Sequence, residues 1–198
     1  AKPSTGTPLD AMRERLLNGE PFPNIVAARR FLADAGWKPT NPEVGNKEAE
    51  ELIEHAVVLA AREIVAGSKN PRETFDQLVK LYEKQPRLGS RTSQSMAEQA
   101  YSTPVPLAYV ASRLADIAGG KRIYEPTAGN GALLIEADPK KQAVLANELN
   151  TDRLANLRSQ GFPTTNEDAL ERKVVAGTDR VIANPPFGAV RVGGESKI

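Results

Sequence analysis

The tetrapeptide Asn184-Pro185-Pro186-Phe187 is the part of this sequence whose residue types point most directly to chemistry. The side-chain oxygen of Asn184 and the backbone carbonyl of Pro185 can both accept hydrogen bonds, and proline stiffens the backbone that carries them. Two acceptors aimed at the N–H groups of a conjugated amine localise the nitrogen lone pair and stabilise the charge that develops there. Phe187 offers a ring on which a base can stack. The tetrapeptide therefore predicts chemistry at an exocyclic amine, and a rigid turn at a strand end is the alternative without function.

A second candidate is the loop Glu125-Pro126-Thr127-Ala128-Gly129-Asn130-Gly131, which follows an expected strand. Gly129 and Gly131 have no Cβ, so the backbone can turn sharply there and approach a ligand closely. Taken alone, this Gly-x-Gly pattern fits an ordinary strand-to-helix turn as well as it fits a ligand site. Its interpretation therefore depends on the residues at the neighbouring strand ends.

Acidic residues follow the next two expected strands. Glu148 comes 23 residues after Glu125, about where nucleotide-binding sheets place the acid that holds a ribose diol. Asp168 can accept a hydrogen bond from the exocyclic amine of a cofactor adenine. Either acid alone would usually be a solvated loop residue. Because the carboxyl ends of parallel strands form the ligand-binding edge of open α/β sheets, the three acids together predict a nucleotide-like cofactor.

The elements that must position these residues alternate between helices and short strands from Tyr101 onward. Thr103 is expected to cap a helix that begins at Pro104 and ends near residue 119. Further helices are expected over 132–137 and 151–160, and strands over 123–125, 143–146, 163–165 and 180–183. This alternation predicts a partial Rossmann-like α/β fold with a parallel sheet in the strand order 3-2-1-4.

Residues 1–98 are expected to form an all-α region that precedes the sheet domain at 99–198. Apolar residues recur at helical spacing, which predicts helices over 8–17, 23–35, 47–66 and 71–84. His55 lies on the longest of these helices, where a structural or solvated role is expected. The polar residues 86–99 are interpreted as a linker, and those after Phe187 as a disordered tail.

Composition limits the classes of function. The chain of 198 residues carries 26 basic and 25 acidic side chains, so no strong overall field attracts nucleic acid. A nucleic-acid surface would have to be a local patch or lie outside this chain. The absence of cysteine excludes disulfides, thiolate zinc sites and a cysteine nucleophile. No metal site and no membrane partner are expected, and the absence of a secretory pattern favours a cytoplasmic location.

From about Gln99 to Phe187, somewhat under half of the chain, these residues resemble the amino-methylating class of S-adenosyl-L-methionine-dependent methyltransferases. Within that class they are most similar to the N6-adenine DNA methyltransferases, including the segment Tyr101-Ser102-Thr103-Pro104. The resemblance implies that the cofactor is S-adenosyl-L-methionine, with Thr103 and its neighbours at the methionine end, Glu148 at the ribose and Asp168 at the adenine. The cofactor-binding residues it implies are Tyr101, Thr103, Glu125, Thr127, Gly129, Gly131, Glu148 and Asp168, and the catalytic residues are Asn184, Pro185, Pro186 and Phe187.

The resemblance also implies that DNA is the methylated partner. The family's sheet continues beyond a fourth strand, so the sequence is interpreted as the N-terminal part of a larger polypeptide, similar to phage and plasmid proteins that join a methylase to a helicase-like region. This chain is accordingly expected to bind cofactor weakly and to methylate poorly. Two alternatives stay open: methylation of guanine N2 in RNA or of protein glutamine, and a non-catalytic DNA-docking or scaffold module.

Overall fold

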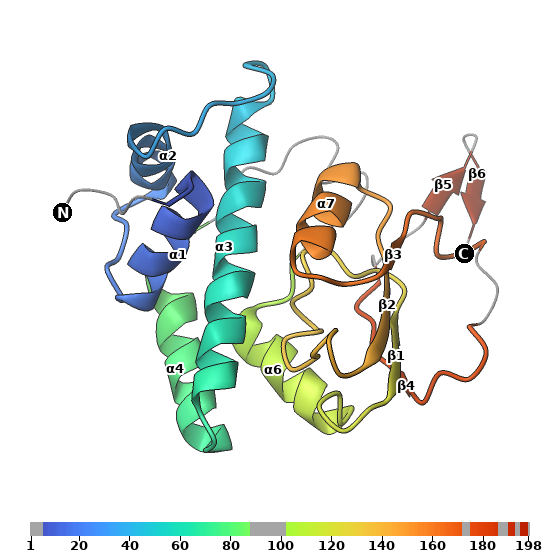
Figure 1. Ribbon diagram of the computed structural model, residues 1–198. Helices are drawn as coiled ribbons and strands as arrows, with labels where there is room; N and C mark the ends of the chain where they lie inside the picture. The colour runs from blue at the N-terminus through green and yellow to red at the C-terminus, as the bar shows by residue number, and fades with distance from the viewer. Residues whose placement is uncertain (1–5, 88–101, 172–174, 186–189, 193–194, 198) are drawn as a thin grey trace.

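The computed structural model describes residues 6–87, 102–171, 175–185, 190–192 and 195–197. Within these ranges the chain is an α/β protein with six helices and a four-stranded parallel sheet (Figure 1). In chain order the elements are α1 (Pro8–Leu17), α2 (Ile25–Asp34), α3 (Gly45–Gly67), α4 (Pro71–Lys84), α6 (Val105–Leu114), β1 (Arg122–Glu125), β2 (Ala143–Asn147), α7 (Thr151–Ser159), β3 (Thr164–Thr165), β4 (Arg180–Val181), β5 (Val190–Val192) and β6 (Glu195–Lys197).

The four expected N-terminal helices are all present, and local capping explains where they begin. The Thr7 side chain accepts a hydrogen bond from the Asp10 N–H, and the Asp10 carboxylate accepts one from the Thr7 N–H, which closes a capping box on α1. The Asn70 side chain caps α4, whose first residue is Pro71. Of the helices described here, none has the length and apolar character needed to cross a bilayer.

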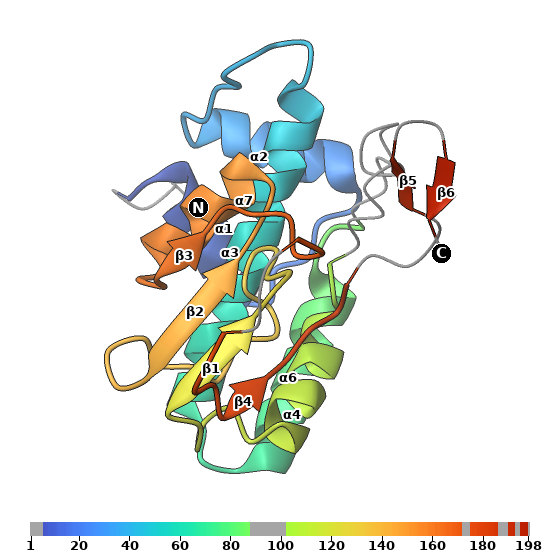
Figure 2. The same cartoon turned by 90° about the vertical axis from the view of Figure 1, so that its right-hand side faces the viewer.

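The predicted strand order is confirmed: the sheet runs β3-β2-β1-β4 with every pairing parallel. Alternation along the strands gives the sheet two different faces. Ile123 and Val144 are buried toward the helices, whereas Tyr124, Leu145 and Val181 share a register on the opposite face and are more exposed. The six helices all lie on one side of the sheet in Figure 1, and Figure 2 looks onto the other side.

The helix α3 joins the two halves of the chain. Its Val58 packs with the sheet residues Ile123 and Val144 in one apolar cluster. In the other direction, Tyr109 of α6 and Ile135 pack into the cluster formed by the N-terminal helices. The expected boundary between residues 98 and 99 is therefore crossed by both clusters, and the division into two domains stays a prediction.

The helix expected over 132–137 is not formed, because this segment is a series of turns. Gly131 has φ 87°, and the Leu134 and Ala137 amides bond to carbonyls three residues back, at 3.2 and 2.9 Å. Arg62 of α3 donates to the Leu134 and Ala137 carbonyls at 2.7 and 2.8 Å.

Two other expectations are corrected. Thr103 does not cap α6, whose N-cap is Pro104 without a side-chain hydrogen bond, because the Thr103 hydroxyl is engaged by Asn184. Residues 190–192 and 195–197, expected to be disordered, form the antiparallel pair β5–β6, and the alternation of β-branched Val190 and Val192 was the missed signal. The expected linker 86–99 lies mostly outside the described residues. The fourth strand, β4, pairs only with β1 among the described strands and forms the edge of the sheet.

Candidate functional site

The carboxyl ends of the four parallel strands meet at one edge, which brings together the loops that carry the candidate residues. Asn147, at the end of β2, holds three of these loops in place. Its amide donates to the Pro126 and Glu167 carbonyls at 3.0 and 2.8 Å, and its oxygen accepts from the Thr165 hydroxyl at 2.7 Å. A buried side chain satisfied this completely has a structural role. Sequence analysis missed it, although a polar residue ending a buried strand was a usable signal.

The two glycines of the 125–131 loop differ in their surroundings. Both have positive φ, 55° at Gly129 and 87° at Gly131, so the conformational reason for glycine is confirmed at both positions. A Cβ on Gly131 would lie 3.1 Å from the Leu157 side chain, which shows that this glycine permits close packing of α7. A Cβ on Gly129 would meet no atom within 4 Å. Gly129 is therefore the one that leaves room for a ligand.

Glu125 and Thr127 carry buried oxygens that lack hydrogen-bond partners among the described residues. The Glu125 side chain is 1% exposed, and neither its Oε2 nor the Thr127 Oγ1 is bonded. Burial raises the pKa of Glu125 well above its ordinary value, and the nearby charge of Glu148 raises it further. Unsatisfied buried polar atoms are rare because they destabilise the fold. Two of them in one loop point to a ligand that would complete their hydrogen bonding.

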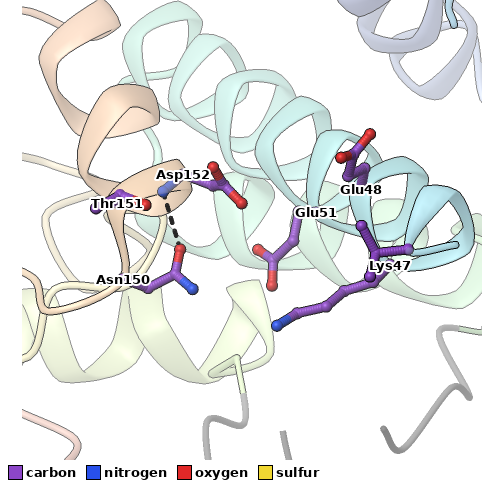
Figure 3. A pocket seen from close by; sticks show the side chains of 7 residues that line it. Lys47, Glu48, Glu51, Asn150, Thr151 and Asp152 are labelled. Carbon is purple, nitrogen blue, oxygen red and sulfur yellow. Dashed lines mark hydrogen bonds between the residues drawn. The ribbon is translucent and has the colours of Figure 1, made fainter. Parts of the chain in front are cut away.

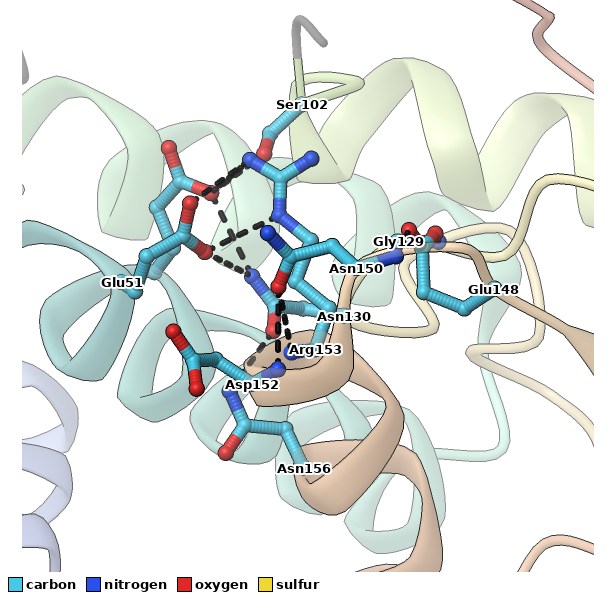
Figure 4. Close-up of polar contacts among 10 residues, drawn as sticks. Glu51, Ser102, Gly129, Asn130, Glu148, Asn150, Asp152, Arg153 and Asn156 are labelled. Carbon is cyan, nitrogen blue, oxygen red and sulfur yellow. Dashed lines mark hydrogen bonds and ion pairs between the residues drawn. The ribbon is translucent and has the colours of Figure 1, made fainter. Parts of the chain in front are cut away.

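Glu148 connects the glycine loop to the start of α7. One carboxylate oxygen accepts from the Gly129 amide at 2.7 Å, and the other accepts from the Asn150 amide at 2.8 Å (Figure 4). Each oxygen keeps a second lone pair that can accept from a ligand hydroxyl. Glu148 thus has a structural task here and retains the capacity for the binding task that the sequence predicts.

Asp168 is exposed, and its Oδ1 accepts from the Leu170 amide at 2.9 Å, so it stabilises a turn beyond β3. Two large apolar side chains stand beside the two acids without being buried: Leu149 is 64% exposed and Leu170 is 77% exposed. Exposed leucines at a strand-end edge provide apolar surface for a flat ring. The sequence signal was available, because each leucine directly or closely follows an acid that ends a strand.

Asn184 follows β4 and is half-buried. Its Nδ2 donates to the Thr103 hydroxyl at 2.9 Å, which brings Thr103 to the end of β4. The Asn184 Oδ1 has no hydrogen-bond partner within the described residues, and Pro185 is exposed. Tyr101, Pro186 and Phe187 lie outside the described residues.

A polar cluster that sequence analysis missed lies where α3, α7 and the glycine loop meet (Figure 4). Arg153 of α7 makes two hydrogen bonds to Glu51 of α3, at 3.0 and 2.8 Å. Glu54, one turn further along α3, accepts from Asn130 at 3.3 Å and from the Ser102 hydroxyl. Burial, followed by the charge of Glu51, raises the pKa of Glu54 to about 7. These partners are far apart in sequence, so no local pattern signals them.

A cavity of about 230 Å³ lies between the first turns of α3 and α7 (Figure 3). Its lining is mostly polar and consists of Val44, Lys47, Glu48, Glu51, Asn150, Thr151 and Asp152. None of these is a predicted site residue, but the Asn150 amide bonds Glu148, so the cavity borders the candidate site. Within the described ranges, no group of three or more histidine, aspartate or glutamate side chains could hold a metal ion.

Comparisons of the chain with protein-family models, curated proteins and solved structures gave no match. The class that the structure defines is an α/β protein whose four-stranded parallel sheet is compatible with a Rossmann-like fold. Anything finer about its activity has to be argued from the geometry of the strand-end edge.

Proposed function

We propose that this chain transfers a methyl group from S-adenosyl-L-methionine to an exocyclic amine, with N6 of adenine in DNA as the substrate. The observation that carries the proposal is the arrangement at the strand-end edge. There, among the residues that the structure describes, the Asn184 oxygen has no partner while its amide nitrogen is bonded to Thr103. On the same edge and within the same residues, Gly129 leaves open space, and Glu125 and Thr127 have oxygens without hydrogen-bond partners. A DNA-methylating chain belongs where the genome lies, which agrees with the cytoplasmic location expected from the sequence.

The residues at this edge fit the chemical groups of the proposed cofactor. A buried carboxyl and a hydroxyl without partners, Glu125 and Thr127, suit the ammonium of the methionine moiety. Glu148 has lone pairs for the ribose hydroxyls, and Asp168 can accept from the adenine amine. The exposed Leu149 and Leu170 offer apolar surface to the adenine ring. When bound, S-adenosyl-L-methionine supplies a methyl group that is already activated by the positive sulfur.

The protein's own contribution is to hold the target amine. An amine conjugated to a purine ring is a weak nucleophile, because its lone pair is delocalised. The Asn184 Oδ1 and the Pro185 carbonyl, placed on the two N–H groups, favour a pyramidal nitrogen and stabilise the developing positive charge. An adenine must leave the double helix to reach these acceptors, and the stacking expected for Phe187 would offset part of the energy of extrusion.

Cofactor binding is tested with two matched glycine substitutions. Gly129→Ala and Gly36→Ala both place alanine at positive φ, 55° and 92°, and neither Cβ meets an atom within 4 Å. Alanine at Gly129 adds backbone strain of about 1 kcal/mol, and alanine at Gly36 adds more because φ 92° lies outside the left-handed helical region, so the control is at least as strained as the test variant. We expect Gly129→Ala to weaken binding of S-adenosyl-L-methionine about tenfold or more, and Gly36→Ala to leave binding unchanged. Because weak binding is expected, NMR titration to millimolar cofactor is the suitable measurement. Equal losses in both variants, or no perturbation of residues 125–131 by cofactor, would contradict the proposal.

Methyl transfer is tested with radiolabelled S-adenosyl-L-methionine and a choice of DNA, ribosomal RNA and protein acceptors. We expect label in DNA as N6-methyladenine, and loss of about a hundredfold or more in Asn184→Ala, since preorganised groups typically contribute that much. Cofactor affinity should be retained in this variant. Label in RNA or protein would replace the DNA substrate with one of the alternatives. DNA binding without cofactor binding would identify a docking module and refute the enzyme.

A further inference from the structure

Ser102 and Thr103 are consecutive residues that bond in two different directions. The Ser102 hydroxyl donates to Glu54 Oε2 on α3, and the Thr103 hydroxyl accepts from Asn184 Nδ2 at 2.9 Å. One carboxylate of the helical region is thus connected to Asn184 through two side-chain hydrogen bonds and a single peptide unit. The first of these hydrogen bonds spans 48 positions in the sequence, and the second spans 81.

The surroundings of Glu54 hold this connection firmly. Its side chain is 19% exposed, and each element packed against it supplies a group. Glu51 lies one turn away on α3, Arg153 of α7 approaches to 4.0 Å, and Asn130 of the glycine loop donates at 3.3 Å. The charged groups that face Glu54 are therefore Glu51 and Arg153, and the polar ones are Asn130 and Ser102.

The placement of Asn184 matters because an amide side chain presents an acceptor at one end and donors at the other. Methylation of an amine needs the acceptor at the target. A displacement on the order of 1 Å of a catalytic group lowers rates about a hundredfold. Whatever fixes the Ser102–Thr103 backbone therefore fixes the position from which Asn184 acts.

We propose that Glu54 and Ser102 are positioning residues for Asn184, so that the N-terminal helical region forms part of the catalytic unit. The proposal rests on the proposed function and deepens it. Glu54 and Ser102 act through Thr103 and need no contact with substrate or cofactor. A hydrogen bond to a carboxylate is about twice as strong as a neutral one. The connection is therefore tightest when Glu54 is ionised, and Asn184 should be held more firmly above pH 7 than below it.

The first test reads the position of Asn184 directly, without any need for activity. In the NMR spectrum of the full chain, the side-chain amide resonances of Asn184 are followed from about pH 5.5 to about pH 8.5, a range that spans the pKa of Glu54. We expect these resonances to titrate with a midpoint near 7 in the native chain. The titration should disappear in Glu54→Gln, which keeps an acceptor but no charge, and in Ser102→Ala. Resonances that stay constant in the native chain, or titrate equally in Ser102→Ala, would overturn the proposal.

A matched variant of the same cluster separates positioning from general damage. Glu51→Gln disturbs the same junction of α3 and α7 but leaves the Glu54–Ser102 bond. Because the charge of Glu51 raises the pKa of Glu54, Glu51→Gln should move the Asn184 midpoint to lower pH while preserving the titration. Loss of the titration in Glu51→Gln as well would mean that the signal reports only on disruption of the junction.

The second test uses kinetics at saturating cofactor. Ser102→Ala should lower kcat roughly tenfold or more while the KM for S-adenosyl-L-methionine changes less than about twofold, and Ser102→Thr, which restores a hydroxyl, should recover most of kcat. An unchanged kcat in Ser102→Ala overturns the positioning role even if the enzyme is active. A native chain that methylates no acceptor refutes the proposed function instead, and the Asn184 titration then decides separately whether the connection exists.

Discussion

At the scale of single residues, His55 shows how strongly burial can change a side chain's chemistry. It lies within α3 at 2% exposure, and neither ring nitrogen has a hydrogen-bond partner among the described residues. Burial penalises the charged imidazolium and lowers the pKa of His55 to about 4. Below about pH 6.5 His55 binds a proton in the unfolded chain but stays neutral in the folded chain. Stability from this residue is therefore present above that pH and is lost as pH falls toward 4.

Replacing His55 with leucine should remove this acid sensitivity. Leucine suits a helix and leaves no unpaired nitrogen, so His55→Leu should unfold with similar or greater free energy at neutral pH. Between pH 7 and pH 4 the native chain should lose about 3 kcal/mol more than the variant. Urea denaturation at the two pH values measures the difference. Since the chain contains no other histidine, equal losses in both proteins would show that His55 titrates normally.

At the scale of elements, Arg62 donates hydrogen bonds to backbone carbonyls that a helix would satisfy with its own amides. It bonds the carbonyls of Leu134 and Ala137, and its guanidinium lies 4.9 Å from the centre of the Phe162 ring. The turns over 131–137 can thus remain buried without helical hydrogen bonds. Their irregular path brings the end of the glycine loop against α3.

Removing that guanidinium should destabilise the fold well beyond an ordinary arginine substitution. Arg62→Met keeps an apolar stem but leaves the Ala137 carbonyl without Arg62 and the Leu134 carbonyl with only the Ala137 amide, which should lower the free energy of unfolding by about 1–3 kcal/mol. Arg72→Met is the control, because the Arg72 side chain is 83% exposed and, among the described residues, pairs only with Asp76 on its own helix. The control should change stability by less than about 0.5 kcal/mol. Chemical denaturation of both variants decides the matter, and similar losses would refute a special role for Arg62.

The same contacts explain which elements the sequence could predict. The helices α1 and α4 have the expected bounds because Thr7 with Asp10 and Asn70 with Pro71 are signals within one turn. The segment 132–137 was misassigned because its carbonyl partner, Arg62, lies more than 70 positions away. Thr103 carried the local signal of a helix cap, yet its hydroxyl bonds Asn184, 81 positions along the chain.

For the candidate site, too, some features could be predicted from the sequence and others could not. The meeting of Glu125, Glu148 and Asn184 at one edge could be predicted, because parallel strands carry their carboxyl ends to the same side. The different roles of Gly129 and Gly131 could not be predicted, because they depend on Leu157 of α7, which packs against Gly131 and not against Gly129. The contribution of Glu54 could not be predicted either, because nothing near it in the sequence indicates that α3 contacts Ser102.

At the scale of the whole molecule, the helical region is part of the sheet's own core. Val58 of α3 packs with the strands, and Arg62 satisfies the buried turns after the glycine loop. Glu51 neutralises Arg153, which is 11% exposed on α7. The sheet contributes only short strands, and α3 covers its helix-facing side together with α6 and α7. Parallel sheets usually have their faces covered by helices, so loss of part of this cover is expected to destabilise the sheet.

A chain of residues 99–198 alone should therefore fail to fold cooperatively. Without α3, the apolar side chains of β1 and β2 lose their contact with Val58, two turn carbonyls lose Arg62, and Arg153 loses its ion pairs with Glu51 and Glu54. Circular dichroism and NMR of this half should show little helix, poor dispersion and no sharp thermal transition. Adding residues 1–98 as a separate chain should restore part of the structure, since the lost contacts are between side chains rather than along a shared backbone. A cooperative transition of the 99–198 chain near that of the full protein would establish the division at residue 98 as a true domain boundary and remove α3 from the core.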